Sequence, residues 1–481
     1  MGELSNDAPA PVEAPLASDT AVIMLGNSKV VDRDFIVGGS PWRLLKLAGG
    51  SVEVVRRWQS GGHVRAGEQR LARTLTQQGV IRPVFHGPLE VEDIDVVIPV
   101  RDDIATLRTL LAQLRGFHVT VVDDASLDPL LLSEITSHFD VNLVRLDVNH
   151  GPGGARNAGA RVTSRPLLCF IDADVELHDA RATLQRLSAQ FQDPLIGACV
   201  PRIMGARAAT LRDRFEERFS PLDLGEREGL VKPGADINFV PSACLMVRRA
   251  AFGDGFEESL RRGEDVDLVW RLHDCGWLVH YNPALIVEHR ARTNWRSWFA
   301  QRIGYGESAA ALAARHPTRL APVRFDVWSL AAWCSLVAGR PMIALRIASV
   351  VRRQIKSRVS ESDEPDVIAN EVLRRAMLSG GGAFARSLVR NYGPLLLMLA
   401  LIKRLRRPAL IIFALGTAWR FRHQRPRPLD VPLAVLDDAA YCVGVTKGAI
   451  HHRSLRALTP SVSPSSLRLR DFLVRPDRLA P

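Results

Sequence analysis

The sequence has little of what a secreted or disulfide-bonded protein needs. Its six cysteines are widely scattered and form no C-x-x-C pair, which argues against disulfides and a structural zinc site and favours a reducing cytosol. The first twenty residues, MGELSNDAPAPVEAPLASDT, have neither the basic start nor the long apolar core of a secretion signal. We therefore expect residues 1–25 to be a disordered tail and the protein to be cytoplasmic.

Signatures of nucleic-acid binding are also missing, because no zinc-finger, RNA-recognition or basic-zipper pattern occurs. With 481 residues, 47% of them hydrophobic, the chain can bury a large core and is not disordered throughout. Its formal net charge of +11 favours an anionic partner. An acidic membrane surface or a phosphorylated substrate fits better than nucleic acid.

A clean run of about 20 apolar residues, the length of a membrane-spanning helix, is absent from the C-terminal third. The stretches 328–351 and 392–419 are apolar but interrupted by arginine, lysine and proline. Within the second stretch, a basic cluster (Lys403, Arg404, Arg406, Arg407) joins two short apolar blocks. This pattern favours a helical hairpin at, or dipping into, an acidic membrane surface; a buried soluble hairpin is the alternative. We expect residues 318–425 to be helical and membrane-associating, at the inner face of the cell membrane, and residues 426–481 to be an irregular basic tail.

The stretch with the clearest chemical pattern is LLCFIDADVEL, residues 167–177. Its apolar run predicts a strand buried on both faces. Asp172 and Asp174 follow at the carboxyl end, and since alternate strand side chains share a face, the two carboxylates can bind one cation. The spacing alone is weak evidence, because it also occurs at Asp32/Asp34, Asp93/Asp95 and Asp265/Asp267.

Residues 94–173 alternate between apolar runs and segments of helical spacing, which predicts an α/β domain with a parallel sheet. The expected strands cover 94–100, 119–125, 141–147 and 167–173. Polar residues follow each strand, at the edge where such sheets bind ligands: Pro99, Arg101, Asp102 and Asp103; Asp123, Asp124 and Ser126; and the turn NHGPGGARNAG with Arg156 and Asn157. The turn has neither the GxxxxGK[ST] pattern of a phosphate loop nor the GxGxxG spacing of a dinucleotide-binding turn. We therefore interpret its glycines as allowing a tight entry into a helix.

Further along, residues 240–249 predict another buried strand, and residues 277–289 a strand pair that ends at His289. Between them lies a helix with Glu264, Asp265 and Asp267 in its first turn, where the helix dipole favours acidic groups. Capping alone is a sufficient explanation for Glu264 or Asp267.

Residues 26–88 predict a small winged-helix-like module. It contains a hairpin over 30–39, a helix over 40–50 with Ser40 and Pro41 at its start, and, within 68–83, a second helix closed by Gly79 and followed by a short extended stretch. An accessory packing domain is the plain interpretation.

The ordered series VVIPVRDD, VVDDAS, NHGPGGARNAG, FIDADVEL, VPSACLMVRR and GEDVDLVWRL resembles the family-2 glycosyltransferases of the GT-A fold. The resemblance covers about residues 94–300; we assign 89–317 to this domain. It implies a nucleotide-sugar donor, a divalent cation (Mg²⁺ or Mn²⁺) and inversion at the anomeric carbon. The roles it implies are Asp174, Asp172 and His289 at the metal, Asp172 also at the ribose, Asp124 and Arg156 at the uracil with Pro99 and Arg101 nearby, and the pair Glu264 and Asp265 as the catalytic carboxylates, Asp265 being the base.

Two departures from that family stand out. Arg101, Asp102 and Asp103 replace the usual aromatic, Asn and Glu, which puts base recognition in doubt. Trp270-Arg271-Leu272 lacks the QxxRW of processive synthases, which weighs against a cellulose-type synthase.

A narrower resemblance rests on GGSPWRLLKL, IDVVIPVRDD, NHGPGGARNAG and residues 288–317. These segments look like the mycofactocin-system glycosyltransferases of actinobacteria, whose N-terminal module resembles the peptide-recognition proteins of pyrroloquinoline quinone biosynthesis. The resemblance implies β-1,4-oligoglucosylation of a small peptide-derived redox cofactor from UDP-glucose. The alternatives are a cell-envelope transferase acting on a lipid-linked or polysaccharide acceptor, and a non-catalytic peptide-binding scaffold.

Overall fold

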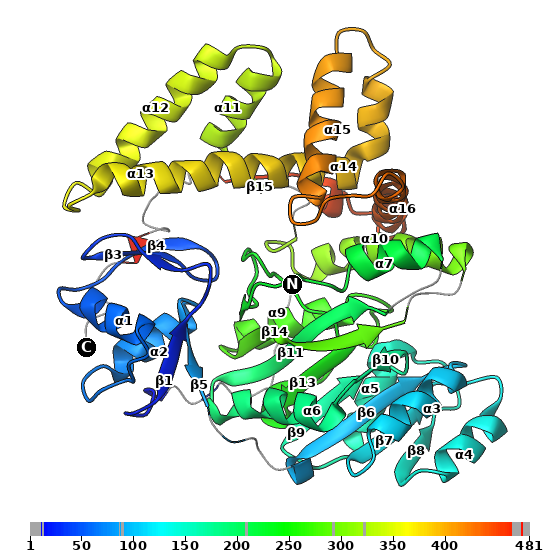
Figure 1. Ribbon diagram of the computed structural model, residues 1–481. Helices are drawn as coiled ribbons and strands as arrows, with labels where there is room; N and C mark the ends of the chain where they lie inside the picture. Colours follow the sequence, from blue (N-terminus) through cyan, green and yellow to red (C-terminus); the bar gives the residue numbers. More distant parts are fainter. Residues whose placement is uncertain are drawn as a thin grey trace.

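A computed structural model describes residues 11, 14–85, 87, 91–206, 210–290, 294–320, 324–463 and 473–474. Figure 1 shows three parts: a small N-terminal module, a large α/β domain beside it, and a layer of helices above both. These parts correspond in outline to the expected order of a module, a transferase-like domain and a helical region.

The α/β domain is built on a nine-stranded mixed sheet with the order β10-β14-β11-β13-β9-β6-β7-β8, to which β12 adds beside β14. The strands β8, β7, β6 and β9 are parallel, as expected from residues 94–173. Strand β13 runs antiparallel to both β9 and β11. Their bounds are β6 Ile94–Val100, β7 His118–Asp123, β8 Val141–Arg145, β9 Leu167–Ile171, β10 Val175–Glu176, β11 Ile196–Gly205, β12 Gly229–Leu230, β13 Cys244–Arg248 and β14 Leu278–His289.

Alternate residues of the same strands enter two different hydrophobic cores, which is why these strands read as continuous apolar runs. In β9, for example, Cys169 belongs to one core and Phe170 to the other. Helices α3 (Ile104–Gln113) and α6 (Ala180–Ala189) pack on the first face, and α5 (Gly151–Arg161) and α9 (Glu264–Asp274) on the second. The other helices of this domain are α4 Pro129–Ser137, α7 Leu211–Phe219 and α8 Arg249–Phe252.

The expected strand pair over 277–289 is wrong, because β14 is a single strand of 12 residues. It lies parallel to β11 with a register shift between Pro201 and Arg202. This irregularity lets one strand continue past the point where a turn was expected. Its far end reaches β10, so that His289 pairs with Val175.

The N-terminal module has two small sheets and two helices around one core (Figure 1). Its elements are β1 Ala21–Met24, β2 Lys29–Val30, β3 Phe35–Gly38, β4 Arg43–Lys46, α1 Ser51–Gln59, α2 Gln69–Gln77 and β5 Ile81–Val84. The expected hairpin over 30–39 is present as β2 and β3. The helix expected before Gly79 is present as α2, and the short extended stretch expected after it as β5.

The expected helix over 40–50 is wrong, because residues 43–46 form β4, antiparallel to β3. Leu44 and Leu45 are both buried but enter different hydrophobic clusters, on opposite faces of the strand. Burial on both faces produced the short apolar run that looked like a helical stripe.

The expected disordered tail over 1–25 is also wrong in its described part. Leu16 is buried in the core of the module, and β1 pairs with β5. The remainder of that prediction, residues 1–10, 12 and 13, lies outside the described residues.

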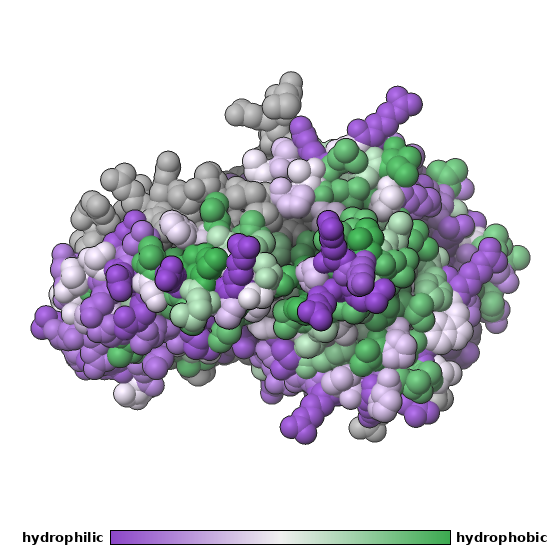
Figure 2. All heavy atoms as spheres, turned by 90° about the horizontal axis from the view of Figure 1, so that it is seen from above, coloured by the Kyte–Doolittle hydropathy of each residue, from purple (hydrophilic) through white to green (hydrophobic). Residues whose placement is uncertain are grey.

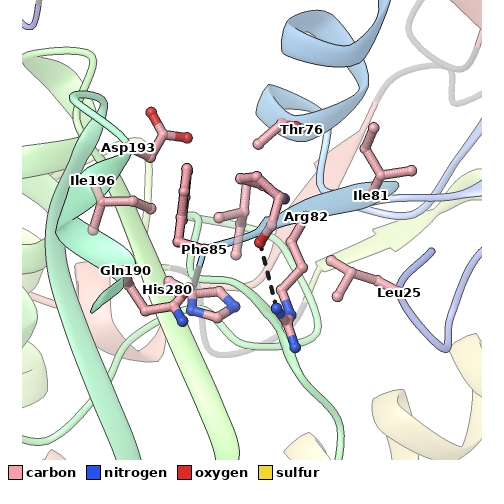
Figure 3. A pocket seen from close by; sticks show the side chains of 11 residues that line it. Leu25, Thr76, Ile81, Arg82, Phe85, Gln190, Asp193, Ile196 and His280 are labelled. Atoms are coloured by element: carbon pink, nitrogen blue, oxygen red, sulfur yellow. Dashed lines mark hydrogen bonds between the residues drawn. The ribbon is translucent and has the colours of Figure 1, made fainter. Parts of the chain in front are cut away.

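Buried polar contacts fix the module to the α/β domain. Arg73 Nη1 donates to both carboxylate oxygens of Asp193, at 2.9 and 2.8 Å, and both side chains are almost fully buried. Lys232 Nζ donates to the Gln77 carbonyl at the end of α2. Figure 3 shows the cavity between the two parts, where Arg82 and Phe85 of the module face His280 of β14. At about 20 Å³ it has room for one water and not for a sugar nucleotide.

The helical layer comprises α10 Trp295–Arg315, α11 Val327–Val337, α12 Pro341–Arg358, α13 Pro365–Arg374, α14 Gly380–Leu399, α15 Arg406–Arg420 and α16 Asp430–His451. Within the described part of the chain, no helix is long and apolar enough to cross a membrane. The expected irregular tail over 426–481 is wrong for α16, which packs against α10. Short pairings add β15 (Arg324–Asp326) to β16 (Ser461–Ser463) and β17 (Leu473–Val474) to β4.

Glycines allow α10 and α16 to approach closely. A Cβ at Gly444 would lie 1.9 Å from the Ile303 carbonyl oxygen, and one at Gly448 would lie 2.6 Å from the Glu307 carbonyl oxygen. These contacts are with backbone, which cannot rotate away as a flexible side chain does. The missing Cβ atoms are therefore a requirement of this helix pair.

Gly444→Ala should lower the free energy of unfolding by about 1–3 kcal/mol, because the two helices must separate. Gly380→Ala is the matched control: it is also helical, but its Cβ would meet nothing within 4 Å. That substitution should stabilise the protein by about 0.5–1 kcal/mol through helix propensity. Urea unfolding of both variants measures these opposite changes in the free energy of unfolding. Equal changes in the two variants would contradict the close contact between α10 and α16.

Candidate active site

The carboxyl end of β9 brings two aspartates together with a histidine from the far end of β14. Asp172 and Asp174 follow β9 directly, and β10, which comes next, pairs with the last residues of β14. His289 Nε2 lies 3.2 Å from Asp174 Oδ1. Ligand atoms from all three side chains lie within 4.8 Å of one another.

The chemistry of this group suits a divalent cation. Two carboxylates and one imidazole form an oxygen-rich set of the kind that binds Mn²⁺ or Mg²⁺ and leaves positions for a substrate. The three side chains are partly exposed, so a ligand can reach them. Among the residues that the structure describes, no other group of three such side chains meets this spacing.

The other Asp-x-Asp pairs include members with structural roles. Asp32 accepts hydrogen bonds from the Arg33 and Asp363 amides, at 2.7 and 2.8 Å. Asp95 accepts from the Ser164 and Arg165 amides, at 2.9 and 2.7 Å. Among the described residues, the pair after β9 is the one whose two carboxylates both lie close enough to a third side chain to share a cation with it.

Arg156, on α5, lies beneath this group and joins it to the start of α9. Its guanidinium donates to Asp172 Oδ1 at 2.6 Å and to Glu264 Oε1 at 2.9 Å, and it lies 5.3 Å from the centre of the Phe256 ring. Burial alone would lower the Arg156 pKa, but the Asp172 and Glu264 carboxylates raise it overall. Arg156 is 2% exposed, so the structure places it under the site; its expected contact with the donor base stays a prediction.

Glu264 and Asp265 begin α9 but lie in different environments. Glu264 is buried against Arg156. Asp265 is partly exposed, with Oδ1 accepting from the Val266 amide at 2.8 Å and Oδ2 from the Ser242 amide at 3.4 Å. Burial of its carboxylate, together with the negative charge of Glu264, raises the Asp265 pKa to about 7. A carboxylate with such a pKa is suited to accept a proton near neutral pH.

Asp267, in the same helical turn, has a structural role. It is fully buried and accepts from Arg271 Nε, Arg315 Nε and His316 Nε2 at 2.7 to 2.9 Å. Burial would raise its pKa, but these hydrogen bonds and positive charges hold the pKa well below its usual range. Asp267 therefore fixes α9 to the end of α10.

Asp124 connects the end of β7 to the start of α5. Its two carboxylate oxygens accept from the amides of His150 at 2.7 Å and Gly151 at 2.9 Å. Gly151 has a φ of +78°, which confirms the tight entry into the helix that its glycines predict. A carboxylate has about four lone-pair positions, and these two amides leave room for a further donor. The expected contact of Asp124 with a donor base therefore stays a prediction.

Pro99 and Arg101 lie at the end of β6, at the same edge of the sheet. Pro99 is partly buried in the strand beside Val122. Arg101 is half-exposed, and its Nε lies 3.8 Å from Asp102 Oδ2. Their expected contacts with the donor stay predictions.

Sequence reasoning missed several residues that hold the site. The Ser242 amide reaches Asp265, the Phe256 ring covers Arg156, and His316 reaches Asp267 from 49 positions away. Ser242 and His316 lie in segments that carry the family resemblances, but those resemblances assign them no role at the site. Contacts of this kind depend on tertiary packing, which residue spacing does not encode.

Comparison with known proteins adds an independent line of evidence. The family described as Glycosyl transferase family 2 matches residues 95–256, which contain Asp172, Asp174 and Arg156. The pre-mycofactocin glycosyltransferase of Mycobacterium tuberculosis is 34% identical over 454 residues, covering 90% of this chain and 95% of that protein. The succinoglycan biosynthesis protein ExoU of Rhizobium meliloti is 29% identical over 239 residues, which are 44% of this chain and 68% of that protein.

Among solved structures, a mannosyltransferase from Pyrobaculum calidifontis in complex with GDP-Man and Mn²⁺ is similar, with 16% identity and a TM-score of 0.42. It covers 74% of this chain and 86% of its own. A similarity this distant adds nothing to the assignment of a substrate or an ion.

Proposed function

The chain belongs to the family of the pre-mycofactocin glycosyltransferases, with a GT-A domain of glycosyltransferase family 2, and from this premise we propose its reaction. The enzyme transfers glucose from UDP-glucose, with inversion, onto a peptide-derived redox cofactor precursor, and repeats the transfer to build a β-1,4-linked chain. The observation that carries the proposal is the grouping of Asp172, Asp174 and His289, which Arg156 links to the start of α9, where Asp265 lies.

The donor half of the proposed site consists of Asp172, Asp174 and His289. A divalent cation held there, Mg²⁺ or Mn²⁺, would neutralise the charge that develops on the departing diphosphate. Asp172 also contacts Arg156, so its carboxylate is oriented before the donor binds. Pro99, Arg101 and Asp124 complete this half by holding the uridine.

The acceptor half consists of Asp265, which removes the proton from the attacking hydroxyl. The hydroxyl oxygen bonds to the anomeric carbon as the bond to the diphosphate oxygen breaks, and the proton moves to the Asp265 carboxylate. Arg156 links the two halves, because one guanidinium contacts both Asp172 and Glu264. We propose that Glu264 acts by raising the Asp265 pKa and by holding Arg156 in place.

Residues 26–88 are proposed to recognise the peptide-derived acceptor. Buried ion pairs between the module and the α/β domain, such as Arg73 with Asp193, support this role because they hold the module at a fixed position beside the transferase domain. A module that only packs against the domain is the alternative. We also propose that the transferase domain covers residues 89–317. The module begins before residue 26, because Leu16 and β1 belong to its core and sheet.

Product analysis tests the reaction. Purified enzyme with UDP-glucose, Mn²⁺ and the redox peptide precursor should give successive mass increments of one hexose, and UDP-galactose or GDP-mannose should give less product. Digestion with a β-1,4-specific glucosidase checks the linkage.

The exposed apolar helices favour a second candidate, transfer to polyprenyl phosphate, so this acceptor is assayed in parallel. Transfer to the lipid with none to the peptide would overturn the proposed acceptor, and donor binding without transfer to any acceptor would favour the scaffold.

A further inference from the structure

Two helical hairpins project from the same side of the molecule (Figure 1). The first consists of α11 and α12; the second consists of the part of α14 beyond Tyr392, where its backbone is non-helical, together with α15. We call these the first and second hairpins. Both tips point away from the α/β domain, so a planar surface can reach the two together.

The charge of both hairpins has one sign. No acidic residue occurs between Asp326 and Glu361 or between Glu371 and Asp430. The tip of the second hairpin bears a basic cluster, all of it exposed: Lys403, Arg404, Arg406 and Arg407. Arg340 and Arg346 are exposed on the first hairpin. Both projections therefore favour an anionic partner.

Large apolar side chains are exposed beside these charges. At the tip of the second hairpin, Leu401 is 79% exposed and Ile402 51%. Figure 2, which views the molecule from the side of the hairpins, shows hydrophobic surface with hydrophilic side chains set within it. The exposed large apolar residues of the two hairpins include Met342, Leu345, Leu395 and Met398 in addition to Leu401 and Ile402.

We propose that the tips of the two hairpins bind the surface of a bilayer that contains anionic lipids. The basic side chains contact the headgroups while the neighbouring apolar side chains enter the boundary with the acyl chains. A nucleic acid would satisfy the positive charge and leave the apolar side chains in water. A second copy of this chain would bring two basic tips together.

The contact is interfacial. Helix α15 has 15 residues, a length of about 22 Å at 1.5 Å per residue, and the hydrocarbon core of a bilayer is about 30 Å thick. If the second hairpin spanned the bilayer, the basic residues at its tip would also have to cross that core. Shallow insertion keeps these charges at the headgroups and holds the α/β domain in water.

Vesicle flotation of the full-length protein tests the proposal. The protein should float with phosphatidylcholine vesicles that contain phosphatidylglycerol, and not with phosphatidylcholine alone. The variant K403E/R404E/R406E/R407E should bind the anionic vesicles at least about tenfold more weakly. Leu401→Ser with Ile402→Ser should also weaken binding, and R65E/R70E, which reverses two exposed charges on the N-terminal module, is the matched control and should bind as wild type.

The outcome is independent of the proposed reaction, because flotation needs neither donor nor acceptor. Equal flotation of wild type and the four-residue variant would overturn the proposal, as would loss of binding in the R65E/R70E control. Unfolding midpoints of all variants show that they are folded. Light scattering tests for self-association: a dimer of the wild type that the tip substitutions dissociate would assign the hairpins to a second copy instead.

Discussion

Asp265→Asn should lower kcat/KM for transfer by about 10²–10⁴-fold, the usual contribution of a positioned general base. The amide keeps the size of the carboxylate but cannot accept the proton of the attacking hydroxyl. Binding of UDP with Mn²⁺ should survive, because the donor half of the site is built from other residues. Asp254→Asn, an exposed aspartate on the loop before α9, is the matched control and should retain full activity. Initial rates and calorimetric UDP titrations measure the two effects separately.

The raised Asp265 pKa gives the same variant a second readout. The wild-type kcat/KM should fall as the pH drops through the region near 7, because only the ionised base is active. Since the folded-state pKa lies above the usual value of 3.8, the folded protein binds this proton more tightly, and stability is lost as the pH rises from about 4 to about 7. Asp265→Asn removes that loss, so its unfolding midpoint relative to wild type should be higher at pH 8 than at pH 5.

Two results would contradict the assignment of Asp265. Turnover in Asp265→Asn equal to that of Asp254→Asn would exclude it as the base. A difference in unfolding midpoint between Asp265→Asn and wild type that does not increase from pH 5 to pH 8 would show that the Asp265 pKa is not raised, contrary to the effect of its burial beside Glu264.

Asp174→Asn should reduce transfer by about 10²-fold or more and weaken donor binding as well. Asp174 supplies a carboxylate oxygen within reach of His289 and Asp172, and an amide oxygen is a weaker ligand for a divalent cation because it carries no charge. Chelation of the wild type should abolish transfer, and added Mn²⁺ or Mg²⁺ should restore it. Calorimetry of UDP with and without Mn²⁺ separates the loss of the cation from the loss of the donor.

His289→Ala extends this test to the third ligand. Its expected effect is smaller, a higher Mn²⁺ concentration for half-maximal activity with a similar maximal rate, because two carboxylates remain. Full activity of the wild type after chelation, or UDP binding that does not depend on Mn²⁺ in any variant, would show that the three residues do not form a metal site.

Local sequence patterns predicted much of the α/β domain correctly. The first four strands, their parallel pairing and the position of Asp172 and Asp174 at a strand end follow from apolar runs separated by helical segments. Such runs are reliable because burial on both faces of a sheet leaves few polar residues. The same property misled the interpretation of residues 40–50, where Leu44 and Leu45 of β4 enter two different cores.

The helical layer was predicted in character but not in extent. The basic cluster at Lys403–Arg407 was recognised within a helical hairpin, and α15 begins at Arg406. Helix α16 was missed because its apolar residues do not form a stripe of helical period. It is held by close contact with α10 at Gly444 and Gly448, and such contact depends on a partner helix that lies more than a hundred residues away.

The sequence by itself determined the fold class, the family resemblance and the residue types at the site, because these depend on local periodicity and on motifs of neighbouring residues. Only the tertiary structure decided the surroundings of the acidic residues at the start of α9. It placed Glu264 against Arg156, left Asp265 partly exposed with a raised pKa, and buried Asp267 among two arginines and a histidine. These environments are set by contacts with α5, with the end of α10 and with Ser242 before β13. A carboxylate acquires its pKa from such surroundings rather than from its place in the chain.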